Sequence, residues 1–400
     1  MKILWVKSGG LLPLDTGGKI RSFNLLKELA KKHDVTLFTF YAAQTADTHD
    51  DLRQYFSRVI HLPVVLPAQR GFGEALKYAR NLITRRPYSL SKYALPEVAS
   101  TLRKLLMEDR YDCLICDFLF SAPIVPWDIP LSKVLFTHNV ETQIWKRHYE
   151  VARNPIWKGV AWREYRTMER AEREYLQKAD HVLTVSENDR QQFGVFLPIE
   201  DMTVIPTGVD IDYFHPSSVP AESNSLVFTG SMDWMPNEDA IQYFVKDIFP
   251  RIRGEIPDAS LCVVGRRPSE RTRALGKENS GVFITGTVED IRPFSWDASV
   301  YVVPLRVGGG TRIKIFEAMA MGKAIVSTPI GAEGLPVEND KNILLEESAE
   351  GFACQVIRLL REPGERAKLG REARKLVEKN YSWGAVAGTF DAVFEKVSMG

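Results

Sequence analysis

The hydrophobic positions in the first half of the chain form short apolar runs separated by helical patterns. The run at 2–6 (KILWV) precedes an amphipathic segment in which Ile20, Phe23 and Leu26 share one helical face. Later apolar runs lie at 35–40, 59–62, 113–116, 134–137 and 181–185. Because these runs lack polar alternation, they predict strands buried on both faces, as in a parallel sheet covered by helices.

The same pattern begins again at 226–230 (LVFTG). Further apolar runs follow at 261–264, 282–284, 300–303 and 324–327, with helical patterns such as 240–252 and 312–321 between them. The pattern predicts an α/β protein with two doubly wound, Rossmann-like domains. We expect an N-terminal domain at 1–205 and a C-terminal domain at 206–381, while a helix at 382–398 could close the second domain or pack back on the first.

A length of 400 residues suits two domains, and 44% hydrophobic with 26% charged residues excludes a disordered chain. We expect a cytoplasmic protein: no apolar run is long enough for a transmembrane helix, the start is too short for a signal peptide, and only four cysteines occur. The net charge is only +1, and the basic residues are not concentrated in one stretch, so no nucleic-acid partner is expected.

Candidate ligand-binding residues follow several of the predicted strands, because doubly wound sheets bind ligands outside the carboxyl ends of their strands. Gly17 and Gly18 open a helix whose free N–H groups could bind an anion, although a plain turn would look the same. His138 follows the run 134–137 and could donate to a sugar hydroxyl or orient a reacting group. The alternative is structural: Asn139 would cap the next helix.

The stretch 303–322 combines a strand, three glycines and a helix that begins near Arg312. The N–H groups of Thr311, Arg312 and Ile313, with the positive charges of Arg312 and Lys314, suit a diphosphate. Glu317 could accept both hydroxyls of a ribose. The Walker A order of residues is absent, which argues against a P-loop ATPase, and a simple glycine-rich turn is the alternative interpretation.

Taken together, these motifs resemble glycosyltransferase family 4 (group 1), a large retaining family with the GT-B fold. The resemblance covers nearly the whole chain and is nearest to bacterial exopolysaccharide-type sugar transferases. Its motifs are Asp15–Gly18, His138–Glu141, Val185–Glu187, Ile205–Asp210, Phe228–Asn237 and the stretch from Gly308 to Gly334.

The resemblance implies a nucleotide-diphosphate sugar donor, with UDP favoured over GDP, and a glycan or lipid-linked acceptor in polysaccharide or glycoconjugate synthesis. Retaining transfer would need no metal or other cofactor, because the leaving phosphate helps to deprotonate the acceptor. The catalytic residues would be His138, at the transferred sugar, with Arg312 and Lys314. The donor-binding residues would be Gly17, Gly18, Gly230, Val288, Gly309, Gly310, Thr311, Arg312, Ile313 and Glu317.

Two departures from the family pattern affect the donor site. Gly309 stands where the family has a first glutamate, eight positions before Glu317, and 231–237 lacks the usual Arg and Lys. Arg312 or Lys314 would then supply the positive charge for the phosphates. Two alternatives stay open: a nucleotide-sugar 2-epimerase, which shares this architecture, and a non-catalytic scaffold subunit, which the missing first glutamate would suit.

No metal-ligand spacing is visible in the sequence. Cys113 and Cys116 are expected on opposite faces of one strand, which indicates buried cysteines rather than a redox pair.

The segments 70–92 and 145–166 each mix six basic residues with aromatic ones. Such segments could make peripheral contact with the anionic inner face of the cell membrane, or they could be ordinary solvated helix faces.

Overall fold

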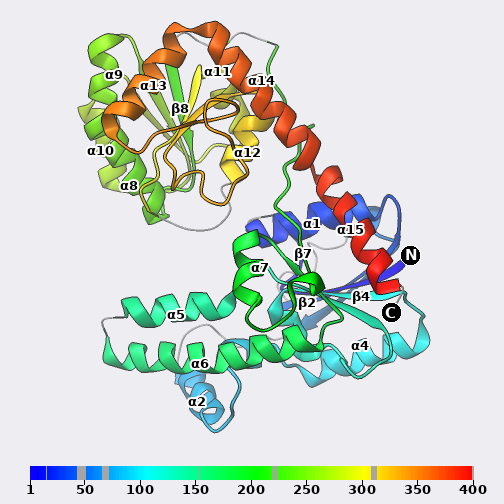
Figure 1. Ribbon diagram of the computed structural model, residues 1–400. Coiled ribbons are helices and arrows are strands. Elements are labelled where there is room, and N and C mark those ends of the chain that lie inside the picture. The colour runs from blue at the N-terminus through cyan, green and yellow to red at the C-terminus, as the bar shows by residue number, and fades with distance from the viewer. Residues whose placement is uncertain are drawn as a thin grey trace. The chain divides into compact units, whose positions relative to one another are not determined.

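The computed structural model describes residues 1–14, 16–42, 51–64, 72–152, 154–218, 221, 224–307 and 313–398. The chain divides into two compact units (Figure 1): unit 1 is Met1–Pro206 with Val386–Gly400, and unit 2 is Thr207–Ala385. Each unit contains one parallel sheet with helices packed around it, and this confirms the predicted α/β architecture.

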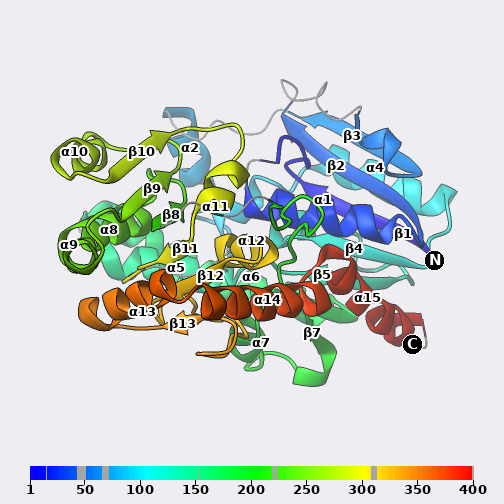
Figure 2. The same cartoon turned by 90° about the horizontal axis from the view of Figure 1, so that it is seen from above.

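Unit 1 has a seven-stranded sheet in the order β3-β2-β1-β4-β5-β6-β7, several strands of which are visible side by side in Figure 2. Its strands are β1 (Lys2–Ser8), β2 (Asp34–Ala42), β3 (Arg58–Val64), β4 (Cys113–Asp117), β5 (Ser132–Phe136), β6 (His181–Thr184) and β7 (Met202–Val204). Its helices are α1 (Gly17–Leu29), α2 (Phe72–Asn81), α3 (Tyr88–Ser91), α4 (Pro96–Glu108), α5 (Glu141–Val151), α6 (Pro155–Lys178) and α7 (Glu187–Phe193), with 3-10 turns at Leu119–Ile124 and Ile199–Asp201. The strand order reverses between β1 and β4, where ligands of such sheets bind.

Unit 2 has a six-stranded sheet in the order β10-β9-β8-β11-β12-β13, which reverses between β8 and β11. Its strands are β8 (Ser225–Thr229), β9 (Ser260–Val264), β10 (Val282–Gly286), β11 (Val300–Val303), β12 (Ala324–Ser327) and β13 (Leu344–Leu345). Its helices are α8 (Met235–Tyr243), α9 (Phe249–Glu255), α10 (Glu270–Glu278), α11 (Arg292–Asp297), α12 (Ile313–Ala320), α13 (Ala349–Arg361) and α14 (Pro363–Asn380).

Burial explains why the apolar runs form central strands. Every residue of β4 and of β11 is buried, so these strands have no solvent-facing side. Cys113 and Cys116 of β4 are both buried and free, as expected for core residues.

Local chemistry changes two expected elements. The helix expected at 240–252 is interrupted by a π-helical turn at Phe244–Ile248. Pro250, near the start of α9, has no N–H and therefore breaks the regular hydrogen-bond ladder there. The sequence also gave no indication of β7 or β13, because strands of three and two residues are too short to show a pattern.

The last helix, α15 (Trp383–Ser398), begins in unit 2, but most of its length belongs to unit 1. The ring of Phe390 packs against Trp5 and Phe136, with centroid distances of 6.2 and 6.3 Å. Within the described ranges, no helix is both long and apolar enough to cross a membrane.

Candidate functional site

In unit 1, two of the predicted residues meet at the point where the strand order reverses. Gly17 and Gly18 are the first residues of α1, directly after the turn that follows β1. A Cβ atom placed on Gly18 would lie 3.6 Å from His138 Nδ1 and 3.7 Å from the Phe118 ring. The start of α1 therefore packs directly against His138, which follows β5.

His138 is buried and uses both ring nitrogens within the protein. Its Nε2 lies 2.6 Å from Asp117 Oδ1, and its Nδ1 lies 3.2 Å from Arg21 Nη1. Since a guanidinium can only donate, Nδ1 accepts, and the assigned tautomer carries its proton on Nε2, which donates to Asp117. A hydrogen bond from this ring to a sugar hydroxyl would therefore require one of these bonds to break.

The charge state of His138 follows from its surroundings. The ring lies between Phe118 and Phe136, with centroid distances of 4.8 and 4.6 Å. Desolvation is the dominant effect and lowers the pKa of His138 to about 4, although Asp117 acts in the opposite direction. The imidazole is therefore neutral at physiological pH.

Asp117, the last residue of β4, is a central member of this cluster that the sequence analysis missed. Its buried carboxylate accepts from Trp5 Nε1 at 2.9 Å, from Lys7 Nζ at 3.1 Å and from His138. Burial alone would raise the pKa of Asp117, but Lys7 and His138 outweigh this effect and hold the pKa well below its usual range. An acidic residue at the end of an otherwise apolar strand was the signal available in the sequence.

The expected capping role of Asn139 is wrong. The N-cap position of α5 is Val140, and the free N–H groups of Glu141 and Thr142 donate to the carboxyl group of Glu172 on α6. Desolvation raises the pKa of Glu172 to about 7. The sequence could not show this cap, because it comes from about 30 residues further along the chain.

In unit 2, the structure brings Gly230 and Lys314 together where β8 ends. Lys314 Nζ donates to Asn237 Oδ1 at 2.9 Å and lies 4.1 Å from the centroid of the Phe228 ring. A Cβ atom on Gly230 would come within 2.7 Å of Lys314 Nζ and of Asn237 Nδ2. The absence of a side chain at Gly230 thus makes room for the ammonium group.

Glu317 follows Lys314 by one turn of α12 and is half-buried. Desolvation raises the pKa of Glu317 to about 7, although the charge of Lys314 opposes this rise. The carboxyl group is therefore close to half ionised at neutral pH, and hydrogen-bond donors from a ligand would favour its charged form.

Two other predicted donor residues lie elsewhere in unit 2. Ile313 is the first residue of α12, and Val288 lies in the turn after β10, partly packed against the core of unit 2. Because β9 lies between β10 and β8, Val288 is not on a strand next to Gly230. Gly309, Gly310, Thr311 and Arg312 lie outside the described residues, and their roles stay predictions.

The two clusters share one arrangement of charge and helix. Each unit places a cation and the start of a helix near the carboxyl end of a central strand. Within the part of the chain that the structure describes, no group of three or more His, Cys, Asp or Glu could hold a metal ion.

Two parallel sheets, each covered by helices, are the architecture of the two-domain glycosyltransferases. Residues 16–213 match the family model described as Glycosyltransferase Family 4, and residues 223–362 match the model described as Glycosyl transferases group 1. Because the two matches cover most of the chain, the protein belongs to this family and is a glycosyltransferase.

Two relatives illustrate the range of similarity. An uncharacterised 44.6 kDa protein in the cps region of Klebsiella pneumoniae is 22% identical and aligns over 99% of both chains. A phosphatidyl-myo-inositol mannosyltransferase of Mycolicibacterium smegmatis is 28% identical, over 50% of this chain and 53% of that protein. The similarity to the mannosyltransferase thus extends over about half of each protein.

Solved structures show the same GT-B fold. A glycosyltransferase from Rickettsia africae superposes with a TM-score of 0.68 at 14% identity, covering 99% of this chain and 98% of that one. Anabaena Alr3699/HepE in complex with UDP gives a TM-score of 0.68 at 14% identity, covering 99% of this chain and 100% of that one. At these identities the likeness establishes the fold alone.

Proposed function

We propose that the protein transfers a sugar, with retention of configuration, from a nucleotide-diphosphate sugar to a glycan or lipid-linked acceptor, and that the nucleotide is UDP. The observation that carries this proposal is the ammonium group of Lys314, fixed beside Gly230 at the end of β8, with Glu317 one turn further along α12. A cation and a carboxyl group at this spacing suit the diphosphate and the ribose of one donor.

Each predicted residue receives a role in this proposal. Lys314, with Arg312, stabilises the negative charge that develops on the leaving diphosphate, so no metal or other cofactor is required. Glu317 accepts the ribose hydroxyls. The N–H groups of Gly17 and Gly18 bind phosphate, and those of Gly309, Gly310, Thr311 and Ile313 bind the diphosphate and sugar. Backbone groups near Val288 hold the base.

The state of His138 supports a mechanism without a protein base. A neutral imidazole whose nitrogens are engaged by Asp117 and Arg21 is poorly suited to remove a proton. The acceptor hydroxyl would attack the anomeric carbon on the face from which the diphosphate leaves. The bond from that carbon to the diphosphate breaks as the new glycosidic bond forms, and the departing diphosphate oxygen takes the hydroxyl proton. His138 then acts as a positioning residue: it packs against the start of α1, and its hydrogen bond to the transferred sugar would replace its bond with Asp117 or Arg21.

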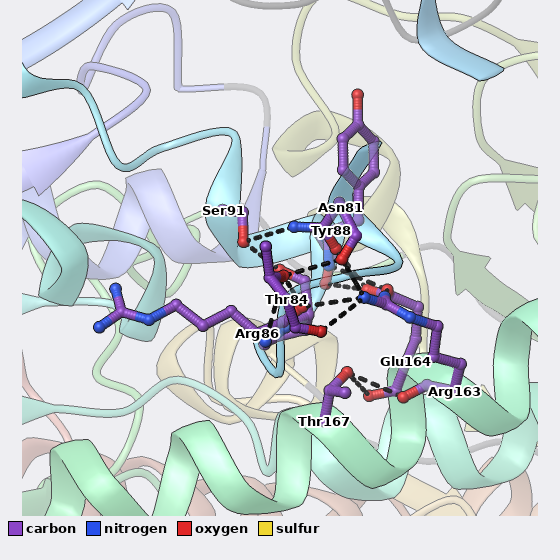
Figure 3. Close-up of polar contacts among 10 residues, drawn as sticks. Asn81, Thr84, Arg86, Tyr88, Ser91, Arg163, Glu164 and Thr167 are labelled. Atoms are coloured by element: carbon purple, nitrogen blue, oxygen red, sulfur yellow. Dashed lines mark hydrogen bonds and ion pairs between the residues drawn. The ribbon is translucent and has the colours of Figure 1, made fainter. Parts of the chain in front are cut away.

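The proposed lipid-linked acceptor is supported by the surface that α2 and α6 form. Figure 3 shows how α6 holds the end of α2 and the segment after it: Arg163 donates to the Asn81 carbonyl at 2.6 Å, and Glu164 accepts from the N–H group of Tyr88. Glu164 also accepts from the N–H group of Ser89. The two basic, aromatic segments 70–92 and 145–166 therefore meet, although they are far apart in sequence.

We call the exposed residues of these two segments the α2–α6 surface, and they include both apolar and basic side chains. Ile83 is 91% exposed, Ile156 79% and Trp162 53%. Arg85 and Lys158 are exposed beside them in sequence. Exposed apolar side chains next to positive charges suit an anionic membrane surface, where the protein would meet a lipid-linked acceptor.

The donor site is tested first by calorimetric titration of UDP, GDP and ADP into the wild type and into Glu317→Ala. We expect UDP to bind, and its Kd to rise at least about tenfold in the variant, because a hydrogen-bonded carboxylate is lost. Glu347→Ala, at an exposed glutamate, is the matched control and should bind as the wild type does.

The outcomes separate the remaining alternatives. Binding of GDP in place of UDP would change the donor class, and no binding by a folded protein would favour the scaffold subunit. Products formed from the donor without an acceptor distinguish a 2-epimerase from a transferase.

Co-sedimentation with vesicles tests the α2–α6 surface. The wild type should pellet with vesicles that contain anionic lipid at low salt, and Ile83→Ser with Ile156→Ser should reduce the bound fraction several-fold. Val195→Ser, at another exposed apolar residue of unit 1, is the control. Equal pelleting of all three proteins, or none by the wild type, would remove the membrane from the proposal.

A further inference from the structure

Asn237, the third residue of α8, is a buried polar side chain with two directed hydrogen bonds. It is 3% exposed. Its Nδ2 donates to the Ser231 carbonyl at 2.8 Å, and its Oδ1 accepts from Lys314 Nζ at 2.9 Å. Since the carbonyl can only accept and the ammonium can only donate, these two partners fix the orientation of the amide.

The amide holds the lysine ammonium at one particular point. Lys314 is the second residue of α12, yet its Nζ reaches across to α8, above the Phe228 ring and against Gly230. A Cβ atom on Gly230 would be 2.7 Å from both Nζ and Asn237 Nδ2. The side chains at 237 and 314 therefore reach the same place at the carboxyl end of β8.

An amide is suited to hold a cation without removing its charge. Aspartate at position 237 would form an ion pair with Lys314 and neutralise it, whereas leucine would leave no acceptor for the ammonium. Lysine at position 237 would repel Lys314. Asparagine fixes the ammonium group without adding a negative charge beside it.

We propose that Asn237 is a positioning residue for donor binding: it holds Lys314 Nζ beside Gly230, at the point where the ammonium meets the donor diphosphate. This role rests on the proposed function, in which Lys314 binds the diphosphate. It assigns a function to a residue of α8 that does not itself act on the sugar.

The test compares UDP with uridine, because only UDP carries the diphosphate. The ratio of their affinities is measured by calorimetry or competition in the wild type, Asn237→Asp, Asn237→Leu and Lys314→Asn. We expect the UDP affinity to fall about ten- to a hundredfold in all three variants, and the uridine affinity to stay within about twofold, since one charge-assisted contact is lost. Asn279→Asp is the matched control, because that amide donates to the Leu275 carbonyl on its own helix, α10.

Asn237→Asp separates positioning from a purely structural role. The variant keeps the shape of the side chain and a partner for Lys314, but it replaces the Nδ2 donor to the Ser231 carbonyl with an acceptor, so it should fold with a lowered melting temperature. If Asn237 only stabilised the fold, Asn237→Asp would bind UDP as the wild type does, and this result would overturn the proposal. Asn237→Asp also carries the test if Asn237→Leu does not fold.

Exchange of the two residues provides a rescue. Asn237→Lys combined with Lys314→Asn puts the ammonium and the amide back at the same point from opposite helices. We expect the exchanged protein to bind UDP at least about fivefold more tightly than Lys314→Asn alone. If the wild-type protein binds neither UDP nor uridine, the proposed function fails. If the wild type binds UDP and the ratio of UDP to uridine affinity is unchanged in every Asn237 variant, only the positioning role fails.

Discussion

Donor binding should depend on pH through Glu317. Its pKa is raised to about 7, first by desolvation and against the opposing charge of Lys314. In the proposed complex, ribose hydroxyls donate to the carboxyl group, and such donors favour the ionised form and lower its pKa. The donor therefore binds the ionised protein, and affinity should fall as the pH drops through about 7.

The size of the effect follows from the titration of one group. With a pKa of about 7 in the free protein, the ionised fraction is about 0.9 at pH 8 and about 0.1 at pH 6. The affinity for the donor should therefore fall about tenfold between these pH values, or about 1.4 kcal/mol. At pH 7, binding should release about half a proton, because half of the free protein is protonated there.

Calorimetry with UDP-glucose as the probe measures both quantities. A sugar nucleotide is preferable to UDP, because the terminal phosphate of UDP itself titrates near neutral pH and would add its own pH dependence. Repeating the titration at pH 7 in two buffers with different ionisation enthalpies counts the released protons.

Two variants locate the titrating group. Glu317→Gln should bind with an affinity that does not change between pH 6 and 8. Glu172→Gln is the matched control, since Glu172 also has a pKa of about 7 but caps α5 in unit 1, and its pH dependence should equal that of the wild type. An affinity that is flat in the wild type, or a slope that survives in Glu317→Gln, would refute the assignment of Glu317 to the ribose.

Two further predictions concern stability and packing. Asp117→Ala leaves the Lys7 ammonium buried without its carboxylate, so urea unfolding of unit 1 should show that the free energy of unfolding falls by about 3–5 kcal/mol. Asp128→Ala, at the surface, is the control and should leave this free energy nearly unchanged. Gly265→Ala places a Cβ within clashing distance of the Gly230 carbonyl oxygen, so β8 and β9 must shift. UDP affinity and melting temperature should both fall in Gly265→Ala. Gly254→Ala is the control, because no atom lies within 4 Å of the added Cβ, and it should melt at or above the wild-type temperature. Equal melting temperatures of the two alanine variants would contradict this packing.

Much of the fold could be predicted because its central strands are buried on both faces. Apolar runs such as 300–303 appear in the structure as strand β11 with the same bounds, since only continuous hydrophobicity satisfies a strand covered by helices. The two-residue β13 and the π-helical turn at 244–248 left no comparable pattern, because each depends on contacts or backbone geometry rather than on periodicity.

The sequence could predict a residue of the candidate site only where that residue comes directly after a predicted strand. Gly18 and His138 could be selected from the sequence because each comes directly after an apolar run. Asp117 was missed because one acidic residue at the end of a run looks like a strand boundary, and its three buried donors come from distant parts of the chain. The neutral state of His138 likewise depends on burial that only the folded chain provides.

The sequence by itself determined the α/β class, the division into two sheets and the family, because these depend on hydrophobic periodicity and on short local motifs. The tertiary structure decided which polar groups meet. Asn237 and Lys314 are 77 positions apart, yet they share one hydrogen bond beside Gly230. Arg163 and Asn81 are similarly distant and join α6 to the end of α2. A directed hydrogen bond or a shift in pKa depends on distances of a few ångströms, and these are set by strand order and packing rather than by local residue pattern.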